Sequence, residues 1–146
     1  AIYTSSMTYT IVGLVVGLKA LGACFSAVGM NYTVGDNQEM KMRLVPVANE
    51  CARTIGLDLT FTPDDFDVTC QFAKPDFGEP SGTSLKALRL VAKTEGIILD
   101  PVYTSKAMDG LISHIQENRF TKQDYVIFLH TGGTPALFAY GDEVFG

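Results

Sequence analysis

The stretch at positions 11–29, "IVGLVVGLKALGACFSAVG", is strongly apolar and limits what the chain can fold into. Lys19 interrupts it, and glycines occupy positions 13, 17 and 22. These breaks argue against a single membrane span, which needs about 20 predominantly apolar residues. No basic segment precedes the stretch, so it does not read as a signal peptide. The pattern instead predicts a helix at 10–21 that is buried all round, followed by a buried strand at 24–29.

The rest of the chain continues this alternation of helices and short apolar strands. We expect strands at 1–3, 24–29, around 66–69, 97–99 and 125–129, and helices at 10–21, 37–55, 83–95, 106–119 and from 133 onward. Residues 4–8 and 100–105 read as loops. Pro46 predicts a kink or a broken first half in the helix at 37–55, and Gly96 is expected to end the helix before it.

Short, continuous apolar strands are typical of a sheet that is buried on both faces. With 146 residues and 47% hydrophobic content, the chain can bury one core. The sequence therefore predicts a single α/β domain over residues 1–146, built as a mostly parallel open sheet with helices on both faces.

Charge and cysteine content narrow the function classes. A net charge of -5 argues against nucleic acid and anionic membranes as partners. The three cysteines have no CxxC spacing, which favours reduced thiols in a cytoplasmic protein and gives no zinc site. The acidic cluster at positions 64, 65 and 67 is typical of a solvated loop, with a weak cation site as the alternative.

Three junctions between a strand and a helix have unusual chemistry: "TSSMTYT" (4–10), "DPVYTSK" (100–106) and "HTGGT" (130–134). In a parallel sheet they would meet at one edge, where such folds bind ligands. The first offers the hydroxyls of Ser6, Thr8 and Thr10 at a helix N-terminus, which suits a phosphate or a carboxylate. The others offer Tyr103, Thr104, Thr131 and Gly132.

Each feature also has an ordinary structural interpretation. Hydroxyl-rich loops usually cap helices, Tyr103 could simply pack, and Gly-Gly could form a tight turn. We expect His130 to be structural and His114 to lie on the surface of its helix.

Two segments resemble a known family. "TEGIILDPVYTSKAMDGLI" (94–112) and "FLHTGGTPALFAY" (128–140) are similar to the C-terminal region of the D-cysteine desulfhydrase and 1-aminocyclopropane-1-carboxylate (ACC) deaminase family. "GLVVGLKALG" and "FGEPSGTSLKALRLVAKTEG" follow the same family in order. These are pyridoxal-phosphate enzymes of the tryptophan synthase β-like fold, known as fold type II. The resemblance therefore implies the C-terminal part of such an enzyme.

The resemblance assigns roles to individual residues. Tyr103 would lie against the cofactor ring and take part in proton transfer. Family deaminases have Glu and Leu where this chain has Thr104 and Thr131, whereas desulfhydrases have Thr at both positions. A neutral hydroxyl leaves the pyridine nitrogen less fully protonated than a carboxylate would, so the ring is a weaker electron sink. That favours release of sulfide and ammonia from D-cysteine, giving pyruvate, with ACC deamination as the alternative.

Departures from the family pattern matter as much. The glycine-rich phosphate loop is replaced by "SMTYT" (6–10), where Tyr9 could obstruct a phosphate. Phe72 and Phe77 stand where tyrosine is common, and Ser105 where glycine is usual. The family's Schiff-base lysine follows an asparagine, and this chain has no Asn-Lys pair.

We therefore expect a fragment that lacks the N-terminal half and its lysine and is inactive alone. In the full-length family a small amino acid is the substrate and a homodimer is expected. A non-catalytic remnant, or a small anion- or nucleotide-binding α/β domain, is the alternative.

Overall fold

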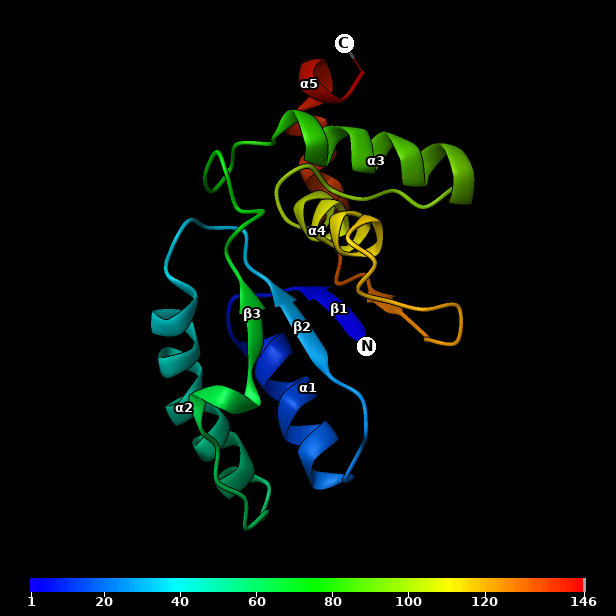
Figure 1. Cartoon of the computed structure of the whole chain (residues 1–146). Helices are drawn as coiled ribbons and strands as arrows, with labels where there is room; N and C mark the ends of the chain where they lie inside the picture. Colours follow the sequence, from blue (N-terminus) through cyan, green and yellow to red (C-terminus); the bar gives the residue numbers. More distant parts are fainter. Residues whose placement is uncertain (146) are drawn as a thin grey trace.

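A four-stranded parallel sheet organises the chain (Figure 1). The computed structural model describes residues 1–145. Its strand order is β3-β2-β1-β4. The strands are β1 (Ile2–Ser5), β2 (Ala27–Met30), β3 (Asp67–Thr69) and β4 (Ile127–Leu129). Every neighbouring pair is parallel, so the expected parallel α/β sheet is confirmed.

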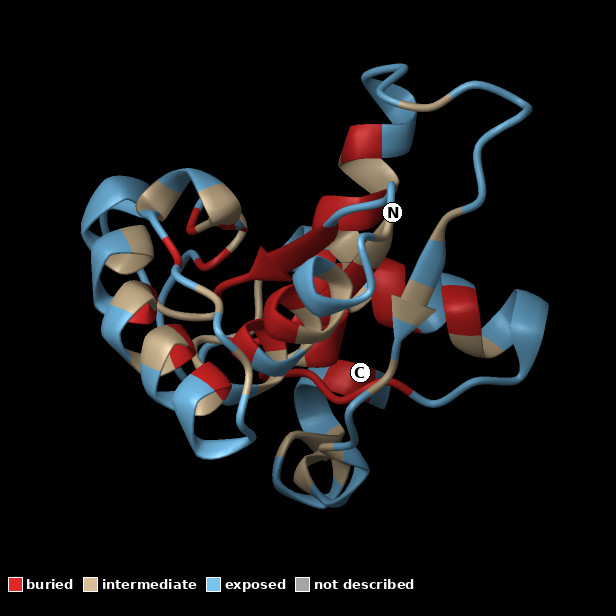
Figure 2. Ribbon diagram, turned by 90° about the horizontal axis from the view of Figure 1, so that it is seen from below, coloured by how far each residue is buried: buried red, intermediate tan, exposed pale blue. Residues whose placement is uncertain are grey.

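Helices cover both faces of this sheet, also as expected. On one face, α1 (Tyr9–Ala20) and α2 (Asn37–Thr54) form a core with β2 and β3. On the other face, α4 (Thr104–Gln116) packs against β1 and β2. The helix α3 (Gly82–Glu95) lies against α4, on its side away from the sheet (Figure 1). Figure 2 shows buried residues on β1, β2 and the helix sides that meet them, whereas β4 is exposed at Ile127 and Leu129.

The helix α2 runs unbroken through Pro46, so the expected broken first half is wrong. Proline removes one backbone hydrogen bond from a helix interior. The inner side of α2 buries Leu44, Ala48 and Ala52. Such tertiary packing supplies most helix stability and outweighs the lost bond.

Three other assignments differ from expectation. Residues 97–99 form no strand, although Leu99 is fully buried, because the carbonyl of Ile98 bonds to His130 rather than to a neighbouring strand. Thr4 and Ser5 belong to β1 rather than to a loop, and β2 begins at Ala27 rather than at 24.

The chain after Gly133 also departs from a regular helix. It forms the 3-10 helix η2 (Thr134–Ala139) and then the short α5 (Gly141–Phe145). The 3-10 helix begins after Gly133, whose backbone is left-handed, and has Pro135 in its first turn. A second 3-10 turn, η1 (Pro63–Asp65), precedes β3. Within residues 1–145, no helix combines the length and the apolarity that crossing a bilayer requires.

Candidate functional site

The strand order creates a switch point between β1 and β4. From β1 the chain adds β2 and β3 on one side, and β4 then pairs on the other side of β1. Open α/β sheets bind ligands beyond the carboxyl ends of the strands at such a point. Here those ends are joined by Thr4, whose Oγ1 donates to the carbonyl of Leu129 at 3.4 Å. The segments at 4–10 and 130–134 are thus neighbours, as the sequence predicts.

The N-terminus of α1 opens onto a hollow of about 330 Å³, lined by residues 5–10 and Tyr32. Ser6 Oγ accepts a hydrogen bond from the backbone N–H of Ile11 at 3.1 Å. Thr8 occupies the cap position, but its side chain makes no capping bond. Ser5 Oγ is buried there with no partner among the described residues. A buried hydroxyl without a partner is rare and points to a missing water or ion.

The backbone around this hollow is also suited to an anion. The N–H groups of Tyr9 and Thr10 have no hydrogen-bond partner within residues 1–145. Free amides at a helix N-terminus and the helix dipole together favour negative charge. Tyr9 is 82% exposed, so its ring stands mostly in solvent at the rim of the hollow.

Aromatic rings lie directly beside the hollow. Tyr32, which lines it, meets Tyr103 edge-on with ring centroids 4.7 Å apart. Phe77 completes the cluster, at 5.9 Å from Tyr103 and 6.0 Å from Tyr32. Burial, and next the neighbouring Tyr103, raise the pKa of the Tyr32 phenol. Sequence reasoning missed Tyr32, although its place just after the end of β2 could have indicated it.

Asp100 fixes the turn that carries Tyr103. This carboxylate is fully buried and accepts hydrogen bonds from the N–H groups of Val102 (2.8 Å), Tyr103 (2.7 Å) and Thr104 (2.8 Å). It also accepts one from Thr104 Oγ1 at 2.6 Å. Sequence reasoning gave Asp100 no role, although an aspartate just before a helix is a capping signal.

The third junction, at 100–106, follows no strand, yet packing brings it beside the segment at 130–134. A Cβ added to Gly133 would lie 2.5 Å from Asp100 Oδ1, so the Gly-Gly turn packs directly on this carboxylate. Both glycines have positive φ, which glycine adopts without strain. Gly132 faces open space, and Thr131 beside it is exposed.

Thr104 differs from Thr131 in its access to a ligand. Thr104 is fully buried. Its hydroxyl donates to Asp100 and accepts from the backbone N–H of Asp100 at 2.9 Å. A ligand therefore reaches this hydroxyl only if the turn moves, whereas Thr131 is open to one.

The two histidines have structural partners. Nδ1 of His130 accepts from the backbone N–H of Gly132, which leaves Nε2 to donate to the carbonyl of Ile98 at 2.9 Å. The expectation that His114 lies on the surface is wrong, because its side of α4 packs onto β1. Nδ1 of His114 is 2.8 Å from the hydroxyl of Tyr3, and burial lowers the pKa of the imidazole.

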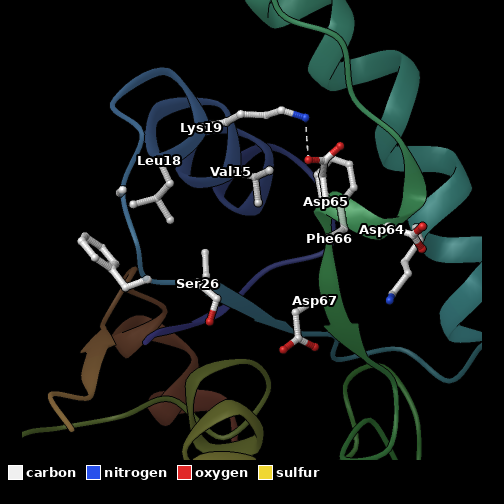
Figure 3. Close-up of a pocket in the computed structure, with 12 residues that line it drawn as sticks. Val15, Leu18, Lys19, Ser26, Asp64, Asp65, Phe66 and Asp67 are labelled. Carbon is white, nitrogen blue, oxygen red and sulfur yellow. Dashed lines mark hydrogen bonds and ion pairs between the residues drawn. The ribbon is translucent and has the colours of Figure 1, made fainter.

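A larger hollow, about 420 Å³, lies at the opposite edge of the sheet. Figure 3 shows its lining at the amino ends of β2 and β3, with Lys19 reaching across to Asp65 at 2.6 Å. Asp65 also accepts from the backbone N–H of Thr62. This part of the acidic cluster is thus already paired. Residues 1–145 hold no group of three His, Cys, Asp or Glu side chains that could bind a metal ion.

Comparison with known proteins agrees with the geometry. A D-cysteine desulfhydrase of Yersinia enterocolitica is 35% identical over 143 residues, which cover 98% of this chain. A probable 1-aminocyclopropane-1-carboxylate deaminase of Schizosaccharomyces pombe is 33% identical over 128 residues, covering 88% of this chain and 38% of that protein. The crystal structure of an ACC deaminase homologue superposes with a TM-score of 0.80 at 29% identity, over 98% of this chain. No family model matches the sequence.

The chain is related to the D-cysteine desulfhydrase and ACC deaminase family. It spans 42% of the length of the Yersinia enterocolitica protein and 42% of the ACC deaminase homologue. This coverage fits the expected C-terminal part of a fold type II enzyme. The family depends on pyridoxal phosphate.

The residues of this chain fit part of that cofactor. The free amides and hydroxyls at α1 suit a phosphate group, and the Tyr32–Tyr103 pair lies next to them. A lysine for the covalent link is not found beside the hollow among residues 1–145. Lys106 is the one buried lysine among residues 1–145, and its Nζ is bonded to the carbonyls of Ala73 and Asp76.

Proposed function

We propose that this chain forms the phosphate-binding and ring-binding part of a pyridoxal-phosphate site in a D-cysteine desulfhydrase-like lyase. One observation carries the proposal. The free amides of the α1 N-terminus and the unpartnered hydroxyl of Ser5 lie around a hollow at the switch point, directly beside the Tyr32–Tyr103 pair. Because the chain spans 42% of its relatives, the catalytic lysine belongs to the part of the full-length relatives that it does not cover.

Each group has a defined task in this proposal. The N–H groups of Tyr9 and Thr10, with the hydroxyls of Ser6, Thr8 and Thr10, bind the phosphate dianion. When bound, the cofactor supplies the electron sink that β-elimination needs.

The remaining groups act on the ring and the substrate. The Tyr103 ring limits the cofactor on one side, and its phenol moves a proton. Thr131 and the backbone of Gly132 meet the pyridine edge. Thr104 joins them only if the turn at Asp100 opens.

The choice of substrate depends on the residue that meets the pyridine nitrogen of the cofactor, here a neutral threonine. A threonine hydroxyl supports less protonation of a pyridine nitrogen than a carboxylate does, so a good leaving group such as thiol is favoured. We therefore place D-cysteine before ACC, although relatives with both names match the chain. A small amino-acid substrate, a homodimeric full-length form, a cytoplasmic location and the absence of a nucleic-acid partner are parts of the same proposal.

Two observations favour a second candidate, a remnant that binds anions without catalysis. The residues Met7, Thr8 and Tyr9 occupy the loop where the family has small residues, and Thr104 is committed to Asp100. Such a remnant would bind phosphate but discriminate poorly between pyridoxal phosphate and other phosphate esters.

Equilibrium dialysis of pyridoxal phosphate against the 146-residue chain tests the proposal. Inorganic phosphate should compete for the site. Thr8→Ala should weaken binding roughly 10-fold, the effect of losing one hydrogen bond to a charged group. The free energy of unfolding of the Thr8→Ala variant should not change, because the Thr8 side chain makes no capping bond.

The matched control is Thr60→Ala, an exposed threonine far from the site, which should bind normally. Binding that phosphate cannot displace, or that Thr8→Ala leaves unchanged, would disprove the proposed site. Equal affinity for pyridoxal phosphate and for a plain phosphate monoester would instead favour the remnant.

A further inference from the structure

Lys106 is a buried cation without a buried carboxylate beside it. Its side chain is 1% exposed and lies in the first turn of α4. Among the described residues, its Nζ donates to two backbone carbonyls, those of Ala73 at 2.7 Å and Asp76 at 2.6 Å. Burial lowers the pKa of this amine, and the negative charges of Asp76 and Glu79 oppose the shift. Burying a charge is costly unless the charge is paired and hydrogen-bonded, so the two bonds to backbone carbonyls must offset part of this cost.

The two carbonyls belong to the loop at 73–79, which connects β3 to α3 and carries Phe77. Asp76 Oδ1 accepts from the N–H of Phe77 at 2.7 Å. The hydroxyl of Tyr140 donates to the carbonyl of Gly78 at 2.6 Å, which ties the far end of the loop. Phe77 is therefore presented on a short segment that is held from both sides.

The same helix turn positions the other half of the aromatic cluster. Tyr103 precedes α4 and is fixed by Asp100, while Lys106 lies three residues further along. Phe77 meets Tyr103 and Tyr32 at centroid distances of 5.9 and 6.0 Å. Phe77 nevertheless remains 55% exposed, so packing alone holds it weakly and the loop must be placed by its hydrogen bonds.

We infer that Lys106 is a positioning residue: its ammonium group holds the loop at 73–79 so that Phe77 closes against the Tyr32–Tyr103 pair as one wall of the ligand site. Because Phe77 has no hydroxyl, this wall contributes ring packing and excludes water, and it transfers no proton. The contact itself is independent of any ligand, while its use in binding rests on the proposed function.

The test compares Lys106→Met with Lys106→Gln, whose NH₂ group can still donate hydrogen bonds but lies on a shorter, neutral side chain. NMR of the ligand-free protein would follow the contacts between the ring protons of Phe77 and those of Tyr103 and Tyr32. We expect both variants to lose the Phe77 contacts, while the Tyr32–Tyr103 contact and the methyl signals of α1 and α2 persist. Lys86→Met, which removes an exposed lysine from α3, should change none of these signals.

Pyridoxal-phosphate affinity provides a second, separate measurement. It should fall roughly 2- to 10-fold in Lys106→Met, the range for losing one aromatic pair. If the Phe77 contacts are lost but the affinity is unchanged, Lys106 does position the loop at 73–79. That loop would then play no part in binding pyridoxal phosphate at the proposed site. Phe77 contacts that survive in a folded variant would overturn the inference. Global unfolding of both variants would also overturn it, because Lys106 would then support the whole fold rather than this loop.

Discussion

The two faces of the sheet are built differently. The core between the sheet and helices α1 and α2 consists of apolar side chains such as Ile11, Leu44 and Phe66. The α4 side buries Asp100, Lys106 and several hydroxyls as well as apolar residues. Among residues 1–145, no buried polar side chain lies on α1 or α2.

This difference separates stability from function. Burial of polar groups contributes little net stability, but unmade hydrogen bonds are costly, so such groups specify one geometry. The α1–α2 face therefore holds the fold together. The α4 face fixes the loops that carry Tyr103, Phe77 and the Gly-Gly turn.

Phe66→Ala should cause the largest loss of stability. This ring is 2% exposed, lies in the α1–α2 core and meets Phe61 at 6.5 Å between centroids. Truncating a buried phenylalanine leaves a cavity and costs about 3–5 kcal/mol of unfolding free energy. Urea unfolding would measure the loss, with Phe138→Ala, at an exposed ring, as the control that should change little. A loss no larger than that of the control would show that this face is not the main source of stability.

Asp100→Ala should have an intermediate effect on stability and a specific effect on the site. It leaves the N–H groups of Val102, Tyr103 and Thr104 without their acceptor. Unsatisfied buried donors cost about 1–3 kcal/mol, and a water entering the vacated space should limit the total to that range. Urea unfolding measures this cost, and NMR of the Tyr103 ring would report its displacement.

The matched variant for Asp100 is Asn, which keeps one acceptor oxygen and should retain part of the stability and of the ring position. The view that this carboxylate organises the turn would be contradicted if the Asp100→Ala variant were as stable as the unmodified chain and kept Tyr103 in place.

The sequence predicts the fold better than it predicts the site. Apolar runs identify β1 and β2 because burial on both faces leaves a continuous apolar signal. The run at β4 is equally apolar, although Ile127 and Leu129 are exposed. The same signal misassigned 97–99, since Leu99 is buried against helices rather than paired in the sheet. Apolarity reports burial and does not report which backbone groups are bonded.

The site depends on contacts between distant segments, which no local pattern encodes. Apolar spacing along α4 would place Ile115 on the inner side of the helix, yet Ile115 is half exposed, whereas the adjacent His114 is buried. A shift of one residue along a helix turns its face by about 100°. Leu111 and His114, three residues apart, form the true inner side. Likewise, only the packing of Gly133 on Asp100 explains the Gly-Gly turn.

The smallest predicted effect concerns pH and the α4 face alone. Burial, and next the positive charge of Arg119, lower the pKa of His114 below its ordinary 6.5. The folded state therefore binds the proton less readily than the unfolded state. Stability should be complete above pH 6.5 and should decrease as the pH falls from 6.5 towards the lowered pKa. The decrease cannot exceed about 1.4 kcal/mol per pH unit, the limit for one proton.

Thermal unfolding of the chain between pH 7.5 and 5.5 would measure this decrease. His114→Asn removes the titrating group and should flatten the curve, whereas Phe138→Ala, at an exposed ring that does not titrate, should leave it unchanged. The hydroxyl of Tyr3 lies 2.8 Å from Nδ1 of His114 and can donate only to the neutral ring. Tyr3→Phe should accordingly reduce the slope without abolishing it. If His114→Asn kept the full slope, the pH sensitivity would come from carboxylates elsewhere, and the buried polar groups of the α4 face would not distinguish it from the α1–α2 face in this respect.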